Sequence, residues 1–386
     1  MHNVVMEKYK DHIAIIGSGI AGLTIGCILL KEGVPSVIFE KHSELGSHGA
    51  GISLSPNALR VLRYMGLKDE VEKISKLTLT TRILDNTKTL YTSSSNVRTT
   101  SREMLYKILL NKYESYGGKI IYNHELRAID SDSSKVFFLN NSNFLVKHVI
   151  ACDGIKSVSR NSISESASIP SYSGYSAWRG IIKSEDNSIN LHLSKNSHIV
   201  SYPIDNEFTS FVAVIKTANE YKEAWKTEGS VDEMKADLSM HPTKLVNRLA
   251  KSNEVFKWGI YKRRDVNKLF VKNITFLGDA AHPIVPFLGQ GGCMAIEDAY
   301  TFGVLTGRLK STFSEVQVAY EKLRLERNNK IQSASVLQGQ LNHIQNPIIA
   351  KGRNLVMKHT PILSIRTKKI WDYDADAAIE KFLVEC

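Results

Sequence analysis

Cysteine is scarce in this chain, and its four cysteines lie far apart. They are Cys27, Cys152, Cys293 and Cys386, and no Cys-x-x-Cys pair occurs. Structural zinc sites and dithiol redox centres need cysteines at short spacing. The spacing therefore argues against a metal site and against a disulfide reductase. We expect Cys27 and Cys293 to be small buried residues of the core.

Runs of like charge are also missing, although the chain is strongly basic. The formal net charge is +11, yet the lysines and arginines are scattered, and acidic residues soon follow the basic stretches 262–264 and 366–369. No zinc spacing, RNA-binding signature or basic tail accompanies this charge, so we do not expect nucleic acid as a partner. The excess charge would favour the approach of anionic small molecules.

Only one apolar stretch is long enough to suggest a membrane segment. No charged residue occurs from Ile13 to Leu30, but three glycines lie near its start and several charged residues closely precede it. A buried strand followed by a helix packed on a sheet is equally apolar. We therefore expect neither a signal peptide nor a spanning helix, and a cytoplasmic location.

A strand–turn–helix–strand pattern stands near the N-terminus. The apolar run 12–16 leads into Gly17-Ser18-Gly19-Ile20-Ala21-Gly22, and the apolar run 36–39 ends at Glu40. Such glycines allow a sharp turn, a close approach of backbone N–H groups to a pyrophosphate, and tight packing of helix on strand. The acid would accept a hydrogen bond from a ribose hydroxyl, so the pattern predicts a dinucleotide site. The contacts expected from this segment are Gly17, Gly19, Ala21, Gly22, Glu40 and Lys41.

The predicted secondary-structure pattern changes near Tyr172. Before it, strand-like runs alternate with helical segments, one of which has Ser101 as its predicted N-cap. After it, short apolar runs separated by polar turns are typical of an antiparallel sheet. Helical periodicity returns at 220–252 and again from about 292 to 339, with a break near Ser311.

We therefore predict an α/β fold with a second, β-rich part. A discontinuous Rossmann-like dinucleotide-binding domain would carry an inserted antiparallel β-sheet substrate domain and a helical C-terminus. The predicted boundaries are 1–75, 98–170 and 270–330 for the first domain, 76–97 and 171–269 for the second, and 331–386 for the C-terminal segment.

Three separated segments together resemble the fingerprints of the single-component FAD-dependent aromatic hydroxylases, the p-hydroxybenzoate hydroxylase-like flavoprotein monooxygenases. They are the glycine motif with Glu40, the segment 151–160 around Asp153-Gly154, and the segment 276–283 around Gly278-Asp279. The segments 49–57 and 289–299 look most like the salicylate hydroxylase and 3-hydroxybenzoate 6-hydroxylase branch. No second dinucleotide fingerprint follows, which separates the chain from Baeyer–Villiger-type monooxygenases.

The resemblance implies bound FAD, with NADPH or NADH docking transiently and O2 as the third reactant. In that family the acid of the Gly-Asp motif binds ribityl or ribose hydroxyls, and a helix N-terminus stabilises negative charge on the reduced flavin. Arg160 would meet the pyrophosphate, and Arg102 would contact FAD. The implied FAD contacts outside the first motif are Gly51, Arg102, Leu126, Asp153, Gly154, Arg160, Gly278, Asp279, Gly289, Gly291 and Gly292.

The implied reaction is hydroxylation of an aromatic or polycyclic small molecule through a flavin C4a-hydroperoxide. Pro286 would shape the reaction site, Arg179 would bind an anionic substrate, and His198 would suit a base at neutral pH. About half of the residues on a strand point away from any pocket, so each expected contact has sheet packing as its alternative. The expected substrate contacts are Arg179, His192, His198, Tyr202 and Phe211.

Several alternatives stay open at this point. The same scaffold serves tetracycline-inactivating monooxygenases, epoxidases, flavin reductases of the geranylgeranyl-reductase type and non-catalytic binding proteins. The chain would be a monomer or a homodimer. The basic, amphipathic stretch 346–386 would pack on the dinucleotide domain or, as the second interpretation, lie on a membrane surface.

Overall fold

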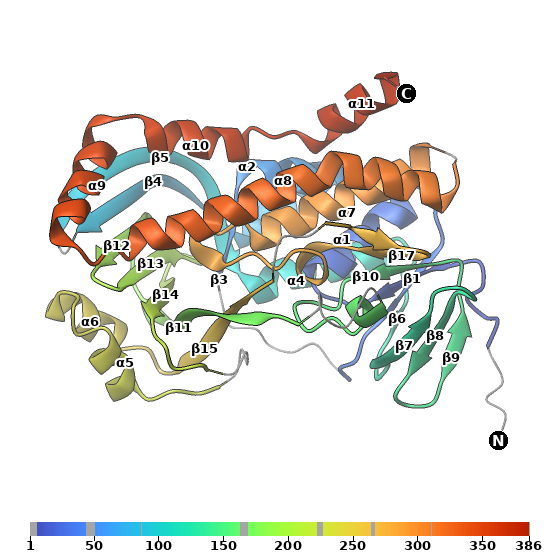
Figure 1. Ribbon diagram of the computed structural model, residues 1–386, viewed down its shortest axis with the longest axis horizontal. Coiled ribbons are helices and arrows are strands. Elements are labelled where there is room, and N and C mark those ends of the chain that lie inside the picture. The colour runs from blue at the N-terminus through green and yellow to red at the C-terminus, as the bar shows by residue number, and fades with distance from the viewer. Residues whose placement is uncertain are drawn as a thin grey trace.

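The fold combines a mainly parallel sheet, a large mixed sheet and a layer of long helices (Figure 1). A computed structural model describes residues 6–43, 51–85, 87–162, 169–221, 227–263, 267–309 and 311–385. Residues 49–50 of the segment 49–57, residue 264 of the basic stretch 262–264, and Cys386 lie outside these ranges.

The first sheet has the strand order β16-β17-β10-β1-β2-β6. Strand β1 pairs in parallel with β2 on one side and with β10 on the other, and β10 pairs in parallel with β17. All four residues of β1, of β2 and of β10 are buried, as expected for a sheet covered on both faces. The strands are β1 Ile13–Ile16, β2 Ser36–Phe39, β6 Ile120–Ile121, β10 His148–Ala151, β16 Phe270–Val271 and β17 Ile274–Phe276.

Helices α1 and α7 pack together against this sheet. A Cβ on Gly22 would lie only 1.9 Å from the Gly17 carbonyl oxygen, and Gly17 has φ +99°, so both positions require glycine. Ser101 caps α4, with its hydroxyl accepting from the Met104 N–H at 3.2 Å, as predicted. The helices on this part are α1 Ile20–Lys31, α2 Pro56–Tyr64, α3 Lys68–Ile74, α4 Arg102–Ser115, α7 Gly291–Arg308 and α8 Phe313–Asn342.

The second sheet has the order β15-β11-β14-β13-β12-β4-β5-β3. Its pairs are antiparallel except for β12 and β4, which are parallel. The expected antiparallel runs are therefore confirmed, and β3, which lies within the segment 49–57, joins them at the edge. The strands are β3 Gly51–Leu54, β4 Lys76–Asp85, β5 Lys88–Ser101, β11 Ser171–Lys183, β12 Ile189–Ser194, β13 Ser197–Pro203, β14 Phe208–Lys216 and β15 Val255–Lys262.

The second sheet has two different faces. Helices α5 (Val231–Asp237) and α6 (Thr243–Leu249) cover one of them, where Trp178, Ile199 and Phe211 form a hydrophobic cluster. On the other face, Ala177 and Val214 pack with Val285, beneath α8. Figure 1 shows α5 and α6 on one side of β11 and the long helix α8 on the other. Only the second face is turned toward the dinucleotide-binding sheet.

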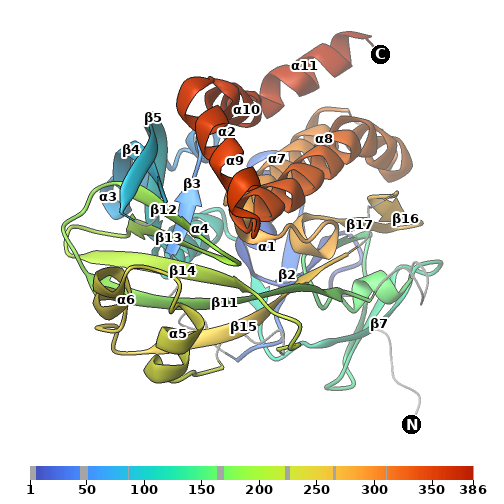
Figure 2. The ribbon, with the colours of Figure 1, turned by 60° about the vertical axis from the view of Figure 1, so that its left-hand side comes forward.

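The remaining elements complete the molecule at its two ends. A small antiparallel sheet consists of β7 Leu126–Asp130, β8 Lys135–Phe138 and β9 Asn143–Leu145. Short 3₁₀ turns follow at η1 Ser159–Ser162, η2 Gly278–Ala280 and η3 Pro286–Leu288. The chain ends in α9 Pro347–His359, α10 Ile362–Trp371 and α11 Ala375–Glu385, which lie on the same side as α8 (Figure 2).

No helix in the described ranges combines the length and the apolar character needed to cross a bilayer. The uncharged stretch that begins at Ile13 consists of β1, a turn and α1, and α1 is only 12 residues long. The expectation that this stretch is a strand followed by a packed helix is therefore confirmed.

Two of the expected substrate contacts face the wrong side of the sheet. Phe211 is fully buried in the cluster beneath α5 and α6. His192 pairs directly with Ile199, a member of that cluster, so its side chain lies on the same face. The strand register, which the sequence did not reveal, places both away from the face toward the dinucleotide-binding sheet, and their assignment to the substrate site was wrong.

Replacing Phe211 should therefore affect stability rather than substrate binding. We expect Phe211→Ala to lower the free energy of unfolding by about 3–5 kcal/mol, because the truncation leaves a cavity in a packed core. Urea denaturation followed by circular dichroism measures this loss. A variant with unchanged stability but a raised KM would contradict the placement.

Candidate active site

The three sequence motifs meet at one edge of the parallel sheet. The glycine turn follows β1, Glu40 follows β2, Asp153 follows β10 and Gly278 follows β17. Because these strands are parallel neighbours, their carboxyl ends lie together, where α/β sheets bind their ligands. A Cβ on Gly17 would lie 2.7 Å from the Cys152 carbonyl oxygen, so the first two motifs are in direct contact.

Open space lies above the backbone at this edge. A Cβ built on Gly19, Gly154 or Gly291 would have no heavy atom within 4 Å. Helix α1 starts at Ile20 with no side-chain cap and no acid in its first turn. Its first N–H groups and its dipole are thus left for an anion such as a pyrophosphate.

Glu40 is held as a carboxylate at the end of β2. Burial would raise its pKa, but hydrogen bonds from the His42 N–H and from the Ser18 N–H and hydroxyl bring the pKa below its usual value. Those from Ser18 both reach Oε2, at 2.8 and 2.7 Å, whereas among the described residues Oε1 accepts one hydrogen bond, from the His42 N–H at 3.0 Å. A carboxylate has about four acceptor sites, so Oε1 can still accept from a ligand hydroxyl. Lys41 beside it is exposed.

Asp153 carries an acceptor that the described residues leave unused. Its Oδ2 accepts from the N–H and the hydroxyl of Ser159, both at 3.0 Å, while its buried Oδ1 has no partner among the described residues. Arg160 donates from Nε to the Ala280 carbonyl at 2.7 Å and from a second nitrogen to the Ala281 carbonyl. Instead of standing free for a pyrophosphate, Arg160 therefore joins the second motif to the third.

Asp279 lies among several cations. Its side chain is exposed at the surface, but desolvation by the surrounding protein raises the pKa of its carboxyl. Arg102 opposes this rise most strongly, followed by His282 and Arg263. Arg263 is buried and donates to the Ile155 carbonyl, and its Nε and Nη1 have no partner among the described residues. Arg263 was not among the expected contacts, because it stands in the basic stretch 262–264, where no sequence motif marks it as a ligand residue.

These features fit a dinucleotide such as FAD. Open positions above glycines, an unused buried carboxylate oxygen on Asp153 and unused guanidinium nitrogens on Arg263 are the groups that a polar, anionic ligand would satisfy. Leu126 fits less well, because its side chain packs in the main core, so a contact with FAD would have to come from its backbone.

The second sheet brings Arg179 and Tyr202 to the same place. Both share the face of Ala177 and Val214, toward the dinucleotide-binding sheet. Arg102, at the start of α4, lies close enough to affect the pKa of Arg179, Tyr202 and Asp279. Residues from both sheets thus surround Arg102.

Arg179 is a buried cation. Its guanidinium carbon lies 5.0 Å from the Phe256 ring centre and 5.6 Å from that of Trp258, and the side chain is 6% exposed. Burial, with a smaller effect of Arg102, lowers its pKa to about 10, so it stays charged at neutral pH. A desolvated guanidinium on an aromatic surface is suited to a carboxylate ligand.

Glycine permits the close approach of β3 to this face. A Cβ on Gly51 would lie 2.5 Å from the Tyr202 ring and 2.8 Å from the Ser210 Cβ. The Gly51 N–H donates to the Ser210 hydroxyl at 3.2 Å. Any side chain at this position would push β3 away from β13 and β14, which belong to the same sheet.

The turn before α7 faces β3. Pro286 and Gly289 are exposed, Gly289 has φ +63°, and the Ser53 hydroxyl donates to the Gly289 carbonyl at 3.4 Å. Helix α7 then begins at Gly291-Gly292 with no acid in its first turn. This N-terminus is positive and open, as the resemblance implied for the helix near the flavin.

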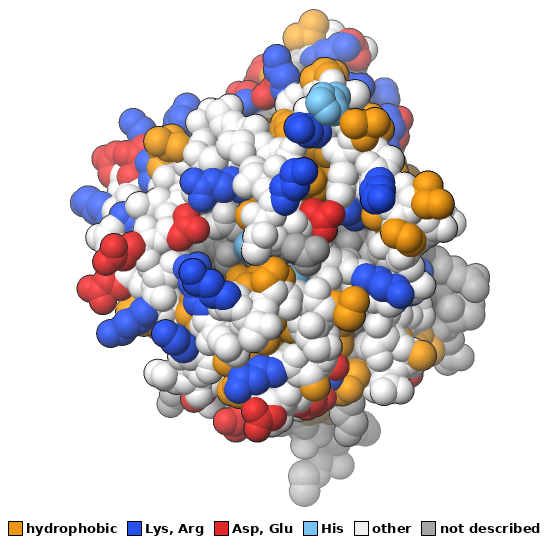
Figure 3. Space-filling view, turned by 90° about the vertical axis from the view of Figure 1, so that its left-hand side faces the viewer, with side chains coloured by type: hydrophobic (Ala, Val, Ile, Leu, Met, Phe, Trp, Pro, Cys, Tyr) orange, Lys and Arg blue, Asp and Glu red, His pale blue; other side chains and the backbone are white. Residues whose placement is uncertain are grey.

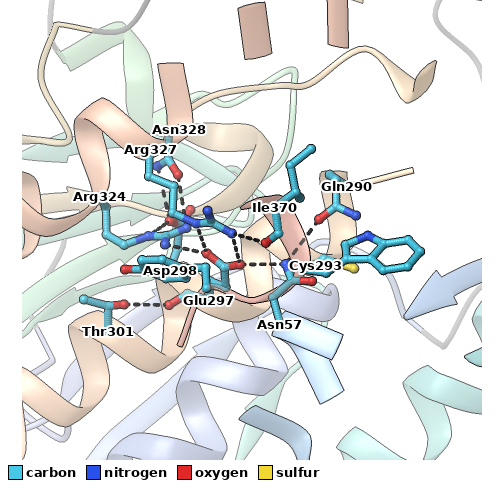
Figure 4. A network of polar contacts seen from close by, with 12 residues as sticks. Asn57, Gln290, Cys293, Glu297, Asp298, Thr301, Arg324, Arg327, Asn328 and Ile370 are labelled. Atoms are coloured by element: carbon cyan, nitrogen blue, oxygen red, sulfur yellow. Dashed lines mark hydrogen bonds and ion pairs between the residues drawn. The ribbon is translucent and has the colours of Figure 1, made fainter. Parts of the chain in front are cut away.

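A buried ionic cluster lies directly behind this turn (Figure 4). Arg327 binds Glu297 with two hydrogen bonds of 2.7 Å, and Arg324 donates to Asp298 at 2.9 Å. Asp298 also accepts from the Gly278 N–H at 3.1 Å and contacts His282. This cluster was not predicted, because its signal in the sequence is limited to two acidic residues inside an apolar helix.

Asn57 and Gln290 connect the ionic cluster to the segment 49–57, which ends in the first residues of α2. Asn57 donates to Glu297 at 2.6 Å and to Gln290 at 3.2 Å, and Gln290 donates to the Ser55 hydroxyl at 3.0 Å. The start of α7 is thereby tied to the start of α2.

His198 shares the site-facing side of the sheet but is engaged elsewhere. It is 3% exposed, and its Nδ1 lies 2.8 Å from Nε2 of His343. The rings of both histidines contact Phe287, in the turn that contains Pro286. Burial lowers the pKa of His198 well below its usual value. No described contact supports the expected base or substrate ligand.

Comparison with known proteins decides the family. The model of the FAD-binding domain family matches residues 10–331, most of the chain. The chain belongs to this family. A 3-amino-4-hydroxybenzoate 2-monooxygenase of Streptomyces platensis is 26% identical over 88% of this chain and 90% of its own length. A 3-hydroxybenzoate 6-hydroxylase of Klebsiella oxytoca is 24% identical, covering 89% and 91%.

Among solved structures, a salicylate hydroxylase in complex with its substrate has the same fold. The TM-score is 0.81 with 21% identity, over 96% of this chain and 98% of the other. Three predictions are thus confirmed for this member of the FAD-binding family. They are the α/β fold class, the resemblance to FAD-dependent aromatic hydroxylases, and FAD as the cofactor. Its class is that of the FAD-dependent monooxygenases, for which NAD(P)H and O2 are typical co-substrates. The roles of individual residues stay predictions.

Gly19→Ala should weaken FAD binding without harming the fold. The new methyl group would occupy open space at the α1 N-terminus and so reach only a ligand. We expect about a tenfold or larger loss of FAD affinity, from the lost approach to the pyrophosphate. Titration of the apoprotein with FAD, followed by fluorescence, measures it. Gly352→Ala, another position with open space, is the matched control, and equal affinities in all three proteins would contradict the placement.

Buried histidines should make stability depend on pH. Burial lowers the pKa of His148, His241 and His343 from 6.5 to about 4, and that of His198 still further. Below pH 6.5 these histidines therefore bind protons in the unfolded chain but stay neutral in the folded chain. The free energy of unfolding should thus decrease as the pH falls from about 7 toward 4.

We expect the free energy of unfolding to fall by roughly 3–5 kcal/mol between pH 7 and 5.5, at up to about 1.4 kcal/mol per histidine and pH unit. His343→Gln should flatten this dependence. Urea denaturation at several pH values measures the slope, and an unchanged stability over this range would contradict the burial of these rings.

Proposed function

We propose that this monooxygenase hydroxylates a small phenolic carboxylate of the hydroxybenzoate type, using NAD(P)H and O2. The observation that carries the proposal is the buried guanidinium of Arg179, which faces the same place as Arg102, Tyr202 and Asp279. The two relatives named above are a 3-amino-4-hydroxybenzoate 2-monooxygenase and a 3-hydroxybenzoate 6-hydroxylase, which supports this substrate class.

Arg179 would bind the substrate carboxylate. Burial and the aromatic rings of Phe256 and Trp258 leave the guanidinium poorly solvated, so it gains most from an anion with two oxygens. The formal net charge of +11 would favour the approach of such an anion. Binding at Arg179 would hold the aromatic ring between the second sheet and the cofactor edge.

Tyr202 would orient the substrate by a hydrogen bond. Burial raises the pKa of its phenol, so the hydroxyl stays protonated and can donate at neutral pH. It lies opposite Ser210 on the neighbouring strand. We assign His198 a positioning role, in which its pairing with His343 supports Phe287 and the turn at Pro286.

The first motif, Glu40, Asp153, Arg102, Arg263 and Asp279 would hold FAD. When bound, FAD accepts electrons from NAD(P)H and activates O2 for transfer of one oxygen atom. The open N-terminus of α7 would stabilise negative charge on the reduced cofactor. Pro286 and the backbone of Gly289 would border the reacting atoms and exclude water from them.

The experiment is NADH and NADPH oxidation by the FAD-loaded protein with O2 uptake and peroxide measured together. The panel contains hydroxybenzoates, aminohydroxybenzoates, the corresponding phenols without a carboxylate, and tetracyclines. Stimulation by a hydroxybenzoate with little peroxide, and weak stimulation by the matching phenol, is the expected result. Stimulation by tetracyclines alone would favour the polycyclic alternative, and flavin reduction without O2 uptake would favour a reductase.

Arg179→Gln should impair use of a carboxylated substrate. A buried hydrogen bond to a charged group contributes about 1.5–3 kcal/mol, so kcat/KM should fall about 10- to 150-fold, mainly through KM. The FAD affinity should stay unchanged. Arg82→Gln, at an exposed position of the same sheet, is the matched control. Equal kcat/KM values for both variants would contradict the assignment.

A further inference from the structure

The segment that contains α9 and α10 is basic and has no acidic residue. None occurs from Asn346 to Trp371, a stretch that carries six lysines and arginines. Acidic residues resume only at Asp372 and Asp374. Elsewhere on the surface, lysines commonly stand beside acids, as Lys107 does with Glu103 and Lys330 with Glu326. This segment is therefore a uniformly positive part of the surface.

One face of α9 is firmly attached to the protein. Met357 is 3% exposed and packs with Ile83 and Leu193 of the second sheet. Asn354 donates to Asp85 at 2.7 Å, and Arg353 donates to the Leu341 carbonyl at 2.8 Å. These contacts fix which side of the helix points outward.

The outward side of α9 is apolar. Ile348, Ile349, Leu355 and Val356 are 78%, 58%, 62% and 46% exposed. Residues at spacings of one, seven and eight share one helical face, and this face is turned away from Met357. In α10, Ile362 and Ile365 are 55% and 51% exposed. Packing on the dinucleotide domain, the first interpretation from the sequence, accounts for Ile370, and packing on the second sheet accounts for Met357. Neither covers this outer face.

Exposed lysines border this apolar face. Lys351 and Lys358 lie one heptad apart on the flank of α9, and Lys368 and Lys369 are exposed on α10. In Figure 3, basic and apolar side chains gather on the upper part of the face that it shows, with few acidic ones among them. We call the outer faces of α9 and α10 the basic apolar surface.

The composition of this surface selects its occupant. A second copy of the chain would bring two positive surfaces together, which is unfavourable. Nucleic acid would match the lysines but not the exposed isoleucines. An anionic bilayer matches both, because its headgroups attract lysines and its acyl region accepts apolar side chains. We propose that the basic apolar surface binds anionic lipid membranes.

The proposal is independent of the reaction catalysed. It concerns only helices that lie outside the residues proposed to bind FAD and substrate. The second sheet links the two regions, since α9 packs on β4 and β12 and the same sheet carries Arg179. A membrane-bound protein would thus have its substrate-facing sheet held beside the bilayer.

The experiment is sedimentation of the FAD-loaded full chain with vesicles of phosphatidylcholine alone or with phosphatidylserine. We expect binding only to the vesicles with phosphatidylserine, and weaker binding at high salt. Lys351→Gln with Lys358→Gln should weaken binding about 30-fold, at about fivefold per lysine. Ile349→Asn with Leu355→Asn should weaken it about tenfold or more. All four positions are exposed or flanking, so circular dichroism should report an unchanged fold.

Lys244→Gln with Lys251→Gln is the matched control, because it removes the same charge from exposed positions near α6. This control should bind like the unmodified chain. No binding to phosphatidylserine vesicles at low salt would overturn the proposal. Equal weakening in the control and the α9 lysine variant would also overturn it, since the attraction would then be due to net charge alone.

Discussion

Helix α7 carries two neighbouring buried carboxylates, Glu297 and Asp298. A buried carboxylate is stable only beside a positively charged group, and this constraint determines which distant parts of the chain pack against α7. Burial would raise the pKa of both, but Arg324, Arg327 and His282 keep the pKa values low. Losing one partner of a buried pair costs about 3–5 kcal/mol, because the remaining charge stays desolvated. The cluster therefore tolerates only the arrangement in which α8 supplies its arginines.

That arrangement positions the candidate site. Asp298 accepts a hydrogen bond from the Gly278 N–H of the Gly-Asp turn, and Glu297 accepts one from the side-chain amide of Asn57 at the start of α2. Arg327 also donates to the Ile370 carbonyl at 3.0 Å, which ties the C-terminal segment to the same cluster. The side chains of this cluster thus hold three parts of the site in place, although they need not contact a ligand themselves. These parts are the third motif, the N-terminus of α7 and the segment 49–57.

Sequence patterns predicted the fold well where local chemistry is distinctive. The glycine turn, the strand ending at Glu40, the Ser101 cap and the antiparallel runs after Tyr172 each have local causes. Strand register has no such cause. Phe211 and His192 therefore lie on the face beneath α5 and α6, whereas Arg179 and Tyr202 lie on the face toward the dinucleotide-binding sheet. Arg263 and the arginines of α8 were missed because pairing with carboxylates far away in sequence leaves no local pattern. His198 was predicted to act as a base because a histidine suits neutral pH, and no local pattern indicated its partner His343, which lies 145 residues further on.

The proposed reaction transfers one oxygen atom from O2 to an aromatic carboxylate. The most direct measurement is mass spectrometry of the product formed under ¹⁸O₂ from the hydroxybenzoate that most stimulates NAD(P)H oxidation. We expect a product carrying one ¹⁸O atom, formed in proportion to the NAD(P)H consumed. Unlabelled product, or NAD(P)H consumed with peroxide as the only oxygen product for every carboxylated aromatic tested, would contradict it.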